Sequence, residues 1–491
     1  MARKQLRERQ EQAIVSLRSS LASGNKRVVV KAPTGFGKTV VAAEIIHLAL
    51  AKGRRVMFVA DAISLIDQTA KSFIDQGIPH VGIIQAQHEL TDPSAPVQVC
   101  SVQTLLRRKY LPDADLVLID ECHVWFKFYE TWMKRWDRIP FIGLSATPYT
   151  KGLGKHYQDL IQTATTQQLI DEGLLADFKV FAPYKPDLTS VKTVGGDYSD
   201  DDLSKVMNNA HLVAGIVEWW QKIGQNRPTF CYAVDCAHAK AIQKAFADAG
   251  IAFGYMDAYT DRDERDELKR EFHDRRIAGV VSVGCLIKGI DWDVRCIILA
   301  RPTKSDSTYQ QIIGRGLRTA SGKDHLLIID HSSTTLRLGF VTDVDERHEH
   351  LDTGKKQESK SKEREEPLPK ECPKCHFLKP PKVWECPQCG CKPERQPMVS
   401  DAEGELKELT RSQKVNNKHA TADEKLLFYG QLLFYCNERG KKPGYAANIY
   451  RRKFGVWPNK YKHAPLLPPT PDTISYIRAN NIRYAKGASG G

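Results

Sequence analysis

The sequence lacks a long hydrophobic run, and none of its apolar stretches approaches the roughly 20 residues that a membrane-spanning helix needs. Its charged start also lacks the apolar core of a secretory signal, which predicts a cytoplasmic protein without a membrane partner. Disulfides are rare in that compartment. We therefore interpret the 12 cysteines as reduced thiols or metal ligands.

The composition of the chain favours a large, basic, multidomain protein. Its 491 residues suggest several domains, and 41% of them are hydrophobic, which is enough to bury a large core. Lysine and arginine outnumber the acids and give a formal net charge of +13. This charge favours an anionic polymer as partner.

Two regions of the sequence alternate apolar runs with helical patterns, as α/β domains with parallel sheets do. The first covers residues 1–150 and the second residues 176–345, with a crossing segment expected over 151–175. Mixed charges without apolar residues predict a linker within 346–370. We expect two sheet domains joined by the crossing segment and followed by a linker.

A phosphate cradle is predicted near the start of the first region. Val28–Val30 is typical of a buried strand, a glycine-containing turn follows, and an amphipathic pattern from Thr39 to Leu50 predicts a helix. This order directs backbone N–H groups at a phosphate. We expect Lys38 to reach the β- and γ-phosphates and Thr39 to bind Mg²⁺. The remaining cradle residues are Thr34, Gly35 and Gly37.

The cradle departs from the strict P-loop pattern because Ala32 stands where that pattern has glycine. A Gly-Lys turn that opens an ordinary helix is therefore the alternative interpretation.

A pair of acids follows the apolar run of residues 116–119. We expect Asp120 to hold Mg²⁺ and Glu121 to orient and deprotonate the attacking water. Two carboxylates alone usually mark a solvated strand end. Their position after a phosphate cradle predicts nucleoside triphosphate hydrolysis instead.

A pair of arginines lies far downstream, within Gln311–Arg318. Arg315 and Arg318 are three residues apart and would share one face of a helix. A guanidinium can stabilise the charge on a transferring phosphoryl group. The separation from the first two motifs predicts a site that a second domain completes across a cleft. A solvated basic helix end is the alternative.

Together these stretches resemble the superfamily 2 helicases and translocases. Residues 32–39 have the form Ala-x-Thr-Gly-x-Gly-Lys-Thr, and residues 120–123 resemble the DEAD/DEAH box. Ser145–Thr147 resembles the motif that couples hydrolysis to strand contacts, and residues 311–318 match Gln-x-x-Gly-Arg-x-x-Arg. The resemblance covers about residues 1–345. It implies two tandem RecA-like motor domains, with ATP and Mg²⁺ as cofactors.

Two further segments extend the resemblance. Gln10 occupies the place of the adenine reader in the Q motif. Lys288–Asp291 resembles a Thr-Gly-x-Asp motif of the second domain, which makes Gly289 and Asp291 nucleotide-binding candidates. Lys288 replaces the threonine of that motif. It could still contact a phosphate, but not in the same way as a threonine.

Within the superfamily, the sequence looks most like the RadD-type DNA repair helicases. The likeness is carried by Arg301–Arg318 and by a cysteine-rich segment after the two motor domains. It implies DNA as partner, single-stranded, forked or branched, together with replication or recombination proteins.

The cysteine-rich segment, residues 371–392, is typical of a zinc ribbon. It contains two Cys-x-x-Cys pairs separated by ten residues, and such pairs supply four thiolates to structural Zn²⁺. Cys391 is a further cysteine that could bind the metal in place of Cys389. The four expected ligands are Cys372, Cys375, Cys386 and Cys389.

A linker over 393–420 is followed by a small helical region over 421–485. Lys441–Tyr445 and Tyr450–Pro458 interleave basic and aromatic residues. This mixture suits phosphate contact with base stacking. It suits equally a small helical domain with an aromatic core and solvated lysines.

The sequence therefore predicts an ATP-dependent DNA helicase or translocase that acts in repair, recombination or replication. Three alternatives stay open: a DNA-stimulated ATPase that strips proteins or anneals strands, an RNA helicase, and a binding module with an inactive motor.

Overall fold

The computed structural model describes most of the chain. The described residues are 3–61, 65–86, 88–287, 291–354, 368–392, 421–454, 456–461, 464–470, 473–474 and 476–477. Within these ranges, no helix combines the length and apolar character needed to cross a bilayer.

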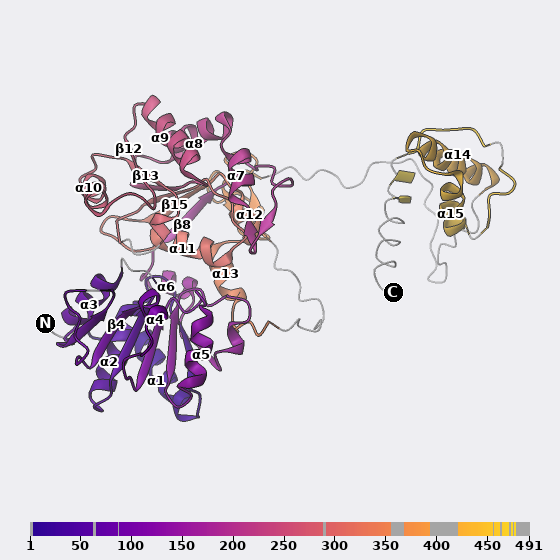
Figure 1. Cartoon of the computed structure of the whole chain (residues 1–491). Helices are drawn as coiled ribbons and strands as arrows, with labels where there is room; N and C mark the ends of the chain where they lie inside the picture. Colours follow the sequence, from indigo (N-terminus) through magenta and orange to yellow (C-terminus); the bar gives the residue numbers. More distant parts are fainter. Residues whose placement is uncertain are drawn as a thin grey trace. The chain divides into compact units, whose positions relative to one another are not determined.

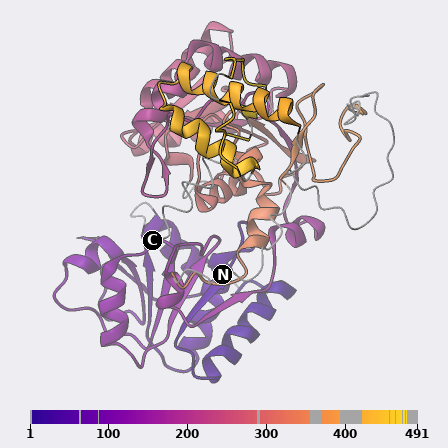
Figure 2. The ribbon, with the colours of Figure 1, turned by 90° about the vertical axis from the view of Figure 1, so that its right-hand side faces the viewer.

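The first domain is built on a seven-stranded parallel sheet in the order β3-β4-β2-β5-β6-β1-β7. Its central strands are apolar and buried, as expected of a parallel sheet covered on both faces. Figure 2 shows helices on both sides of this sheet. The strands are β1 (Arg27–Lys31), β2 (Val56–Ala60), β3 (Val81–Ile84), β4 (Val97–Ser101), β5 (Leu116–Asp120), β6 (Phe141–Ser145) and β7 (Asp159–Gln162). The helices are α1 (Glu8–Ala22), α2 (Lys38–Leu50), α3 (Ile66–Asp75), α4 (Val102–Arg107), α5 (Lys127–Arg135) and α6 (Thr166–Asp171).

The second domain has a six-stranded parallel sheet in the order β12-β13-β11-β14-β15-β8. The strands are β8 (Asp177–Phe181), β11 (Thr229–Tyr232), β12 (Phe253–Met256), β13 (Gly279–Ser282), β14 (Cys296–Leu299) and β15 (His325–Asp330). The helices are α7 (Asp200–Met207), α8 (Ala210–Ile223), α9 (Cys236–Asp248), α10 (Arg262–His273), α11 (Asp306–Gly316), α12 (Thr334–Leu338) and α13 (Val341–Arg347). A hairpin of β9 (Thr193–Val194) and β10 (Asp197–Tyr198) precedes α7.

The predicted crossing segment, residues 151–175, is partly wrong. β7 lies within it and pairs with β1, so the first sheet extends beyond residue 150. The strand has only four residues, and Asp159 and Gln162 are polar ends, so its apolar pattern is too short to recognise in the sequence.

The chain returns to the first domain after the second sheet is complete. Lys31, the last residue of β1, forms a fully buried ion pair with Asp345 of α13, with 2.8 Å between Nζ and Oδ1. Farther along, the Gly154 N–H donates to the Asp352 carbonyl over 2.7 Å. The linker predicted from residue 346 therefore begins with a stretch that packs on the first domain. In Figure 1, α6, α11 and α13 lie at the junction of the two sheets.

A small ribbon is attached to the second domain. It contains the antiparallel strands β16 (Lys370–Glu371) and β17 (Leu378–Lys379). The Ala182 N–H, just after β8, donates to the His376 carbonyl over 3.0 Å, so the ribbon lies against the edge of the second sheet.

The described residues from 421 onward belong to a separate compact unit. Its helices α14 (Ala422–Glu438) and α15 (Pro443–Phe454) pack through a common apolar core.

Candidate active site

Three of the predicted motifs meet at one edge of the first sheet. The strands β5, β6 and β1 are neighbours, and their carboxyl ends lead into Glu121, Ala146 and Ala32 respectively. The carboxyl edge of a parallel sheet is where ligands bind in such folds. The strand order thus brings together segments that are more than 100 residues apart in the chain.

The phosphate loop has the shape expected of a cradle. Gly35 and Gly37 have φ values of 82° and 91°, in the region that favours glycine. A Cβ on Gly35 would lie 2.4 Å from Leu175 Cδ2. Ala32, the departure from the strict pattern, donates its N–H to Ser145 O over 2.8 Å and so continues the strand pairing. Its place in an extended ladder explains why glycine is not required there.

Lys38 is the first residue of α2 and points at both acids. Its Nζ forms an ion pair with Glu121 and lies 3.4 Å from Asp120 Oδ1. Burial alone would lower the pKa of Lys38, but the two carboxylates outweigh burial and raise it. Burial acts in the opposite sense on Glu121, but the Lys38 ammonium prevails and holds the pKa of Glu121 below its usual range. Lys38 and Glu121 are therefore both charged at neutral pH.

Glu121 is held in an unusual backbone conformation. Its φ is 47°, in the left-handed region, which carries strain for a residue with a side chain. The preceding Asp120 accepts the Glu121 N–H through Oδ1 over 3.0 Å, which stabilises the turn. This geometry directs two adjacent carboxylates to the same cavity.

His123 connects the acids to the second domain. Its Nδ1 lies 2.9 Å from Ser145 Oγ and 3.3 Å from Glu121 Oε2, and its Nε2 lies 3.0 Å from Gln311 Nε2. Gln311 also donates to Thr147 Oγ1 over 3.2 Å. The sequence contained these residues in its motifs, but their spacing did not reveal that His123 and Gln311 meet.

A cavity of about 600 Å³ lies between the two domains. Arg315 and Arg318 line it from the second domain, opposite Lys38 and Glu121. Burial lowers the pKa of Arg315, as does the nearby Arg318. Arg318 forms an ion pair with Asp291. The predicted site residues that line the cavity are Thr34, Gly35, Gly37, Lys38, Thr39, Asp120, Glu121, Asp291, Arg315 and Arg318.

The domains approach closely at this cavity. A Cβ on Gly314 of α11 would lie 2.4 Å from Thr34 Oγ1 and 2.9 Å from Thr34 Cβ. Glycine is thus the residue that permits α11 to reach the phosphate loop in this arrangement.

Gln10, the predicted adenine reader, lies against the phosphate loop and is not among the residues that line the cavity. Its side chain is 2% exposed, and its Nε2 donates to Phe36 O over 2.6 Å. The cavity wall nearby is formed by Arg7, which also donates to the carbonyls of Gly35 and Phe36. Gln10 and Arg7 together support the phosphate loop. Gly289 lies outside the described residues.

Hydroxyl and carboxylate oxygens suited to Mg²⁺ lie beside the phosphate loop. Thr39 and Asp120 both line the cavity, and hard oxygen donors of this kind are the ligands that Mg²⁺ prefers. The donor set therefore fits the predicted metal.

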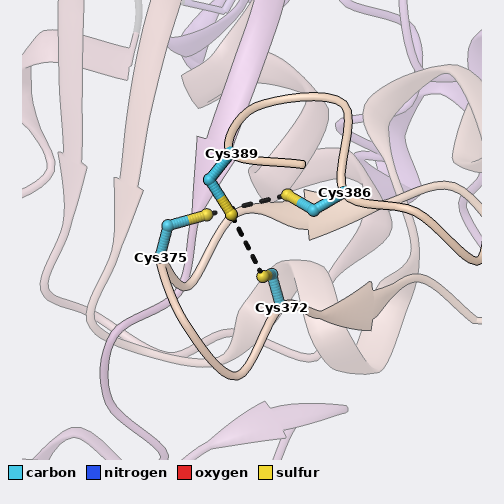
Figure 3. A group of neighbouring side chains, drawn as sticks. All are labelled: Cys372, Cys375, Cys386 and Cys389. Carbon is cyan, nitrogen blue, oxygen red and sulfur yellow. Dashed lines mark hydrogen bonds between the residues drawn. The ribbon is translucent and has the colours of Figure 1, made fainter. Parts of the chain in front are cut away.

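The four predicted zinc ligands converge in the ribbon (Figure 3). Their sulfur atoms all lie within 4.8 Å of one another. The Cys372–Cys389 and Cys375–Cys386 sulfur pairs are each 3.7 Å apart. Sulfurs bound tetrahedrally at about 2.3 Å from zinc would be about 3.8 Å apart. The four thiols can therefore hold one metal ion.

Two family models match the chain. The model described as "Type III restriction enzyme, res subunit" matches residues 3–150, and "Helicase conserved C-terminal domain" matches residues 210–320. The first match contains the phosphate loop and both acids, and the second contains both arginines.

Two curated relatives cover most of the same region. "Putative ATP-dependent helicase IRC3" of Saccharomyces cerevisiae is 30% identical over 359 residues, which cover 66% of this chain and 51% of the relative. A "51.5 kDa protein" of a Lactococcus phage is 28% identical over 371 residues, 74% of this chain and 77% of the relative. The chain thus spans about half the length of the yeast relative.

Solved structures share the fold. A fragment of a putative HsdR subunit of a type I restriction enzyme from Vibrio vulnificus has a TM-score of 0.54 at 21% identity, covering 71% of this chain and 67% of that chain. The ATP-dependent type ISP restriction-modification enzyme LlaBIII bound to DNA has a TM-score of 0.51 at 17% identity, covering 67% of this chain and 28% of that chain. Together with the two family models, this shared fold is consistent with tandem RecA-like helicase domains.

Proposed function

We propose that this chain, which belongs to the superfamily 2 helicases and is an ATP-hydrolysing enzyme, couples ATP hydrolysis to movement along DNA. The cavity between the domains carries this proposal. It has a cation and two acids on one wall and two arginines on the other. Closing the domains would assemble the site, and opening them would dismantle it, so hydrolysis is linked to domain motion.

Each residue has a distinct task in this proposal. Lys38 exchanges its Glu121 partner for the β- and γ-phosphates, which frees Glu121 to act on the attacking water. Thr39 and Asp120 would hold Mg²⁺, which would neutralise phosphate charge. Arg315 and Arg318 stabilise the charge that develops on the transferring group. Gly289 and Gln10 remain proposed contacts of the nucleotide site.

His123 and Gln311 provide a route between hydrolysis and motion. Their contact joins the acid-bearing loop to α11, which also carries Arg315 and ends at Gly316, two residues before Arg318. A change at Glu121 would therefore alter its contact with His123 and, through the His123–Gln311 hydrogen bond, reach the second domain. Neither sheet would need to distort.

DNA is the proposed track. The net charge of +13 supports a polyanionic partner, and a structure that shares this fold is bound to DNA. The resemblance of Arg301–Arg318 to RadD-type helicases supports repair, recombination or replication as the setting. The two family models and the yeast relative support the superfamily, but they do not distinguish the RadD-type members.

We also propose that the ribbon binds one structural zinc ion. Four thiolates leave no position for a substrate, and the site is remote in sequence from the ATP motifs. The ion would hold the turns of a segment whose two short strands provide little core.

The test is ATP turnover by the full chain with single-stranded DNA, duplex DNA, a forked duplex or RNA as stimulant. We expect DNA to increase turnover, and Glu121→Gln to lower both basal and stimulated rates by about 10²–10⁴-fold. Stimulation by RNA alone would assign an RNA helicase, and no stimulation by any polymer would contradict the proposed coupling. Strand separation on the labelled fork then distinguishes an unwinding enzyme from a translocase or an annealing ATPase.

A further inference from the structure

The C-terminal unit contains a segment that has cations and no acids. Residues 439–461 include seven lysines and arginines and neither aspartate nor glutamate. Mutual repulsion makes such a cluster unfavourable unless a polyanion neutralises it. The segment comprises the turn after α14, the whole of α15 and the residues that follow it.

The structure separates the aromatic residues of this segment into two groups. Tyr450 and Phe454 are buried with Leu432 in the core between α14 and α15, with exposed fractions of 1% and 8%. Their role is therefore packing, as one of the two sequence interpretations predicted. Trp457 is different, because 46% of its surface remains exposed.

The exposed cations lie beside aromatic rings, of which Trp457 is exposed and Tyr445 is partly buried. Arg451 and Arg452 are exposed near the end of α15, and the Arg451 guanidinium carbon lies 4.5 Å from the centre of the Trp457 ring. At the other end of the helix, Lys441 Nζ lies 4.1 Å from the centre of the Tyr445 ring, next to exposed Lys442. We call Lys441, Lys442, Arg451, Arg452 and Trp457 the basic-aromatic surface.

We propose that the basic-aromatic surface binds single-stranded nucleic acid. The four cations would neutralise backbone phosphates, and Trp457 would stack on a base. An unpaired strand offers exposed base faces to an indole, whereas a duplex keeps its bases stacked inside. The inference rests on the proposed function only in taking DNA as the nucleic acid, and it places a contact outside the two motor domains.

The experiment measures binding of the full chain to a labelled single-stranded oligonucleotide over a range of salt concentrations, without ATP. Lys441→Ala/Lys442→Ala should weaken binding and lower the slope of log K against log salt by about 1.4, since each single-strand phosphate contact contributes about 0.7. The matched control, Lys240→Ala/Lys244→Ala, removes two exposed lysines from α9 and should leave the slope unchanged.

Trp457 is tested separately. Trp457→Ala should weaken single-strand binding about tenfold, Trp457→Phe should restore most of it, and duplex binding should change little in both. Equal slopes for the two double-lysine variants, or an equal effect of Trp457→Ala on single strand and duplex, would overturn the proposal. Unchanged binding in every variant would also overturn the proposal. An acidic protein would then be the partner of this surface.

DNA-stimulated ATP turnover of the unmodified chain keeps the two proposals apart. If turnover is stimulated but these variants bind normally, the surface assignment fails and the proposed motor function stands. If turnover is not stimulated but the variants lose binding as expected, the motor function fails and the surface assignment stands.

Discussion

At the scale of residues, the proposed ATP site divides into groups expected to bind the nucleotide and a group expected to activate water. Lys38→Ala should lower ATP turnover by about 100-fold or more, because it removes a phosphate contact. Glu121→Gln should lower turnover by about 10²–10⁴-fold, the usual worth of a general base, while ATP still binds. Turnover and nucleotide binding are measured on both variants. Normal hydrolysis by Glu121→Gln would show that another group activates the water.

The sequence allowed the residues that we propose to react to be selected, but not the residues that hold them in place. Lys38, Glu121 and Arg315 stand at fixed places in recognisable motifs, and all three line the cavity. Arg7 supports the phosphate loop from 28 residues away in the chain, and Gln311 meets His123 from 188 residues away. Contacts at such separations leave no periodic signal, so they emerge only once the sheets are assembled.

At the scale of elements, α13 is tied to the end of β1 by a buried ion pair. Asp345 accepts from Lys31 over 2.8 Å and from the Thr166 N–H over 2.6 Å. Asp345→Ala would leave the Lys31 ammonium buried without its carboxylate, at a cost of about 3–5 kcal/mol. We expect a lower thermal unfolding midpoint. The double variant Lys31→Met/Asp345→Leu should recover most of that loss, and a double variant as unstable as Asp345→Ala would contradict this account.

The ribbon is the element in which we propose a structural zinc ion. Cys372→Ser should lower zinc content from about one ion per chain, because three thiolates hold zinc poorly. Cys391→Ser is the matched control, since Cys391 lies outside the cluster of four sulfurs, and it should retain the ion. Metal analysis of protein purified without chelator measures both. Equal zinc loss in the two variants would assign Cys391 as a ligand.

The elements that sequence patterns predicted best are the buried strands beside the site. Val28–Val30 and residues 116–119 are continuous apolar runs, and they form β1 and β5. β7 and the return of residues 348–352 to the first domain were not predicted. Their backbone pairing depends on the neighbouring β1 and Gly154, not on an apolar pattern of their own.

At the scale of the whole molecule, the two domains contribute the two halves of the proposed ATP site. Arg315 should act in the transition state, because charge develops on the phosphoryl group as it transfers. Arg315 is held by α11 of the second domain, opposite the acids of the first, so its effect reports on closure of the cleft.

The most direct test compares maximal ATP turnover with ATP affinity in Arg315→Ala. We expect a loss of turnover on the order of 10³-fold, with the dissociation constant of ATP changing by less than about tenfold, since ground-state binding would rest on the first domain. Arg315→Lys should recover little, because an ammonium lacks the planar fork of guanidinium. Equal losses of affinity and turnover would contradict the account and make Arg315 a ground-state contact of the nucleotide.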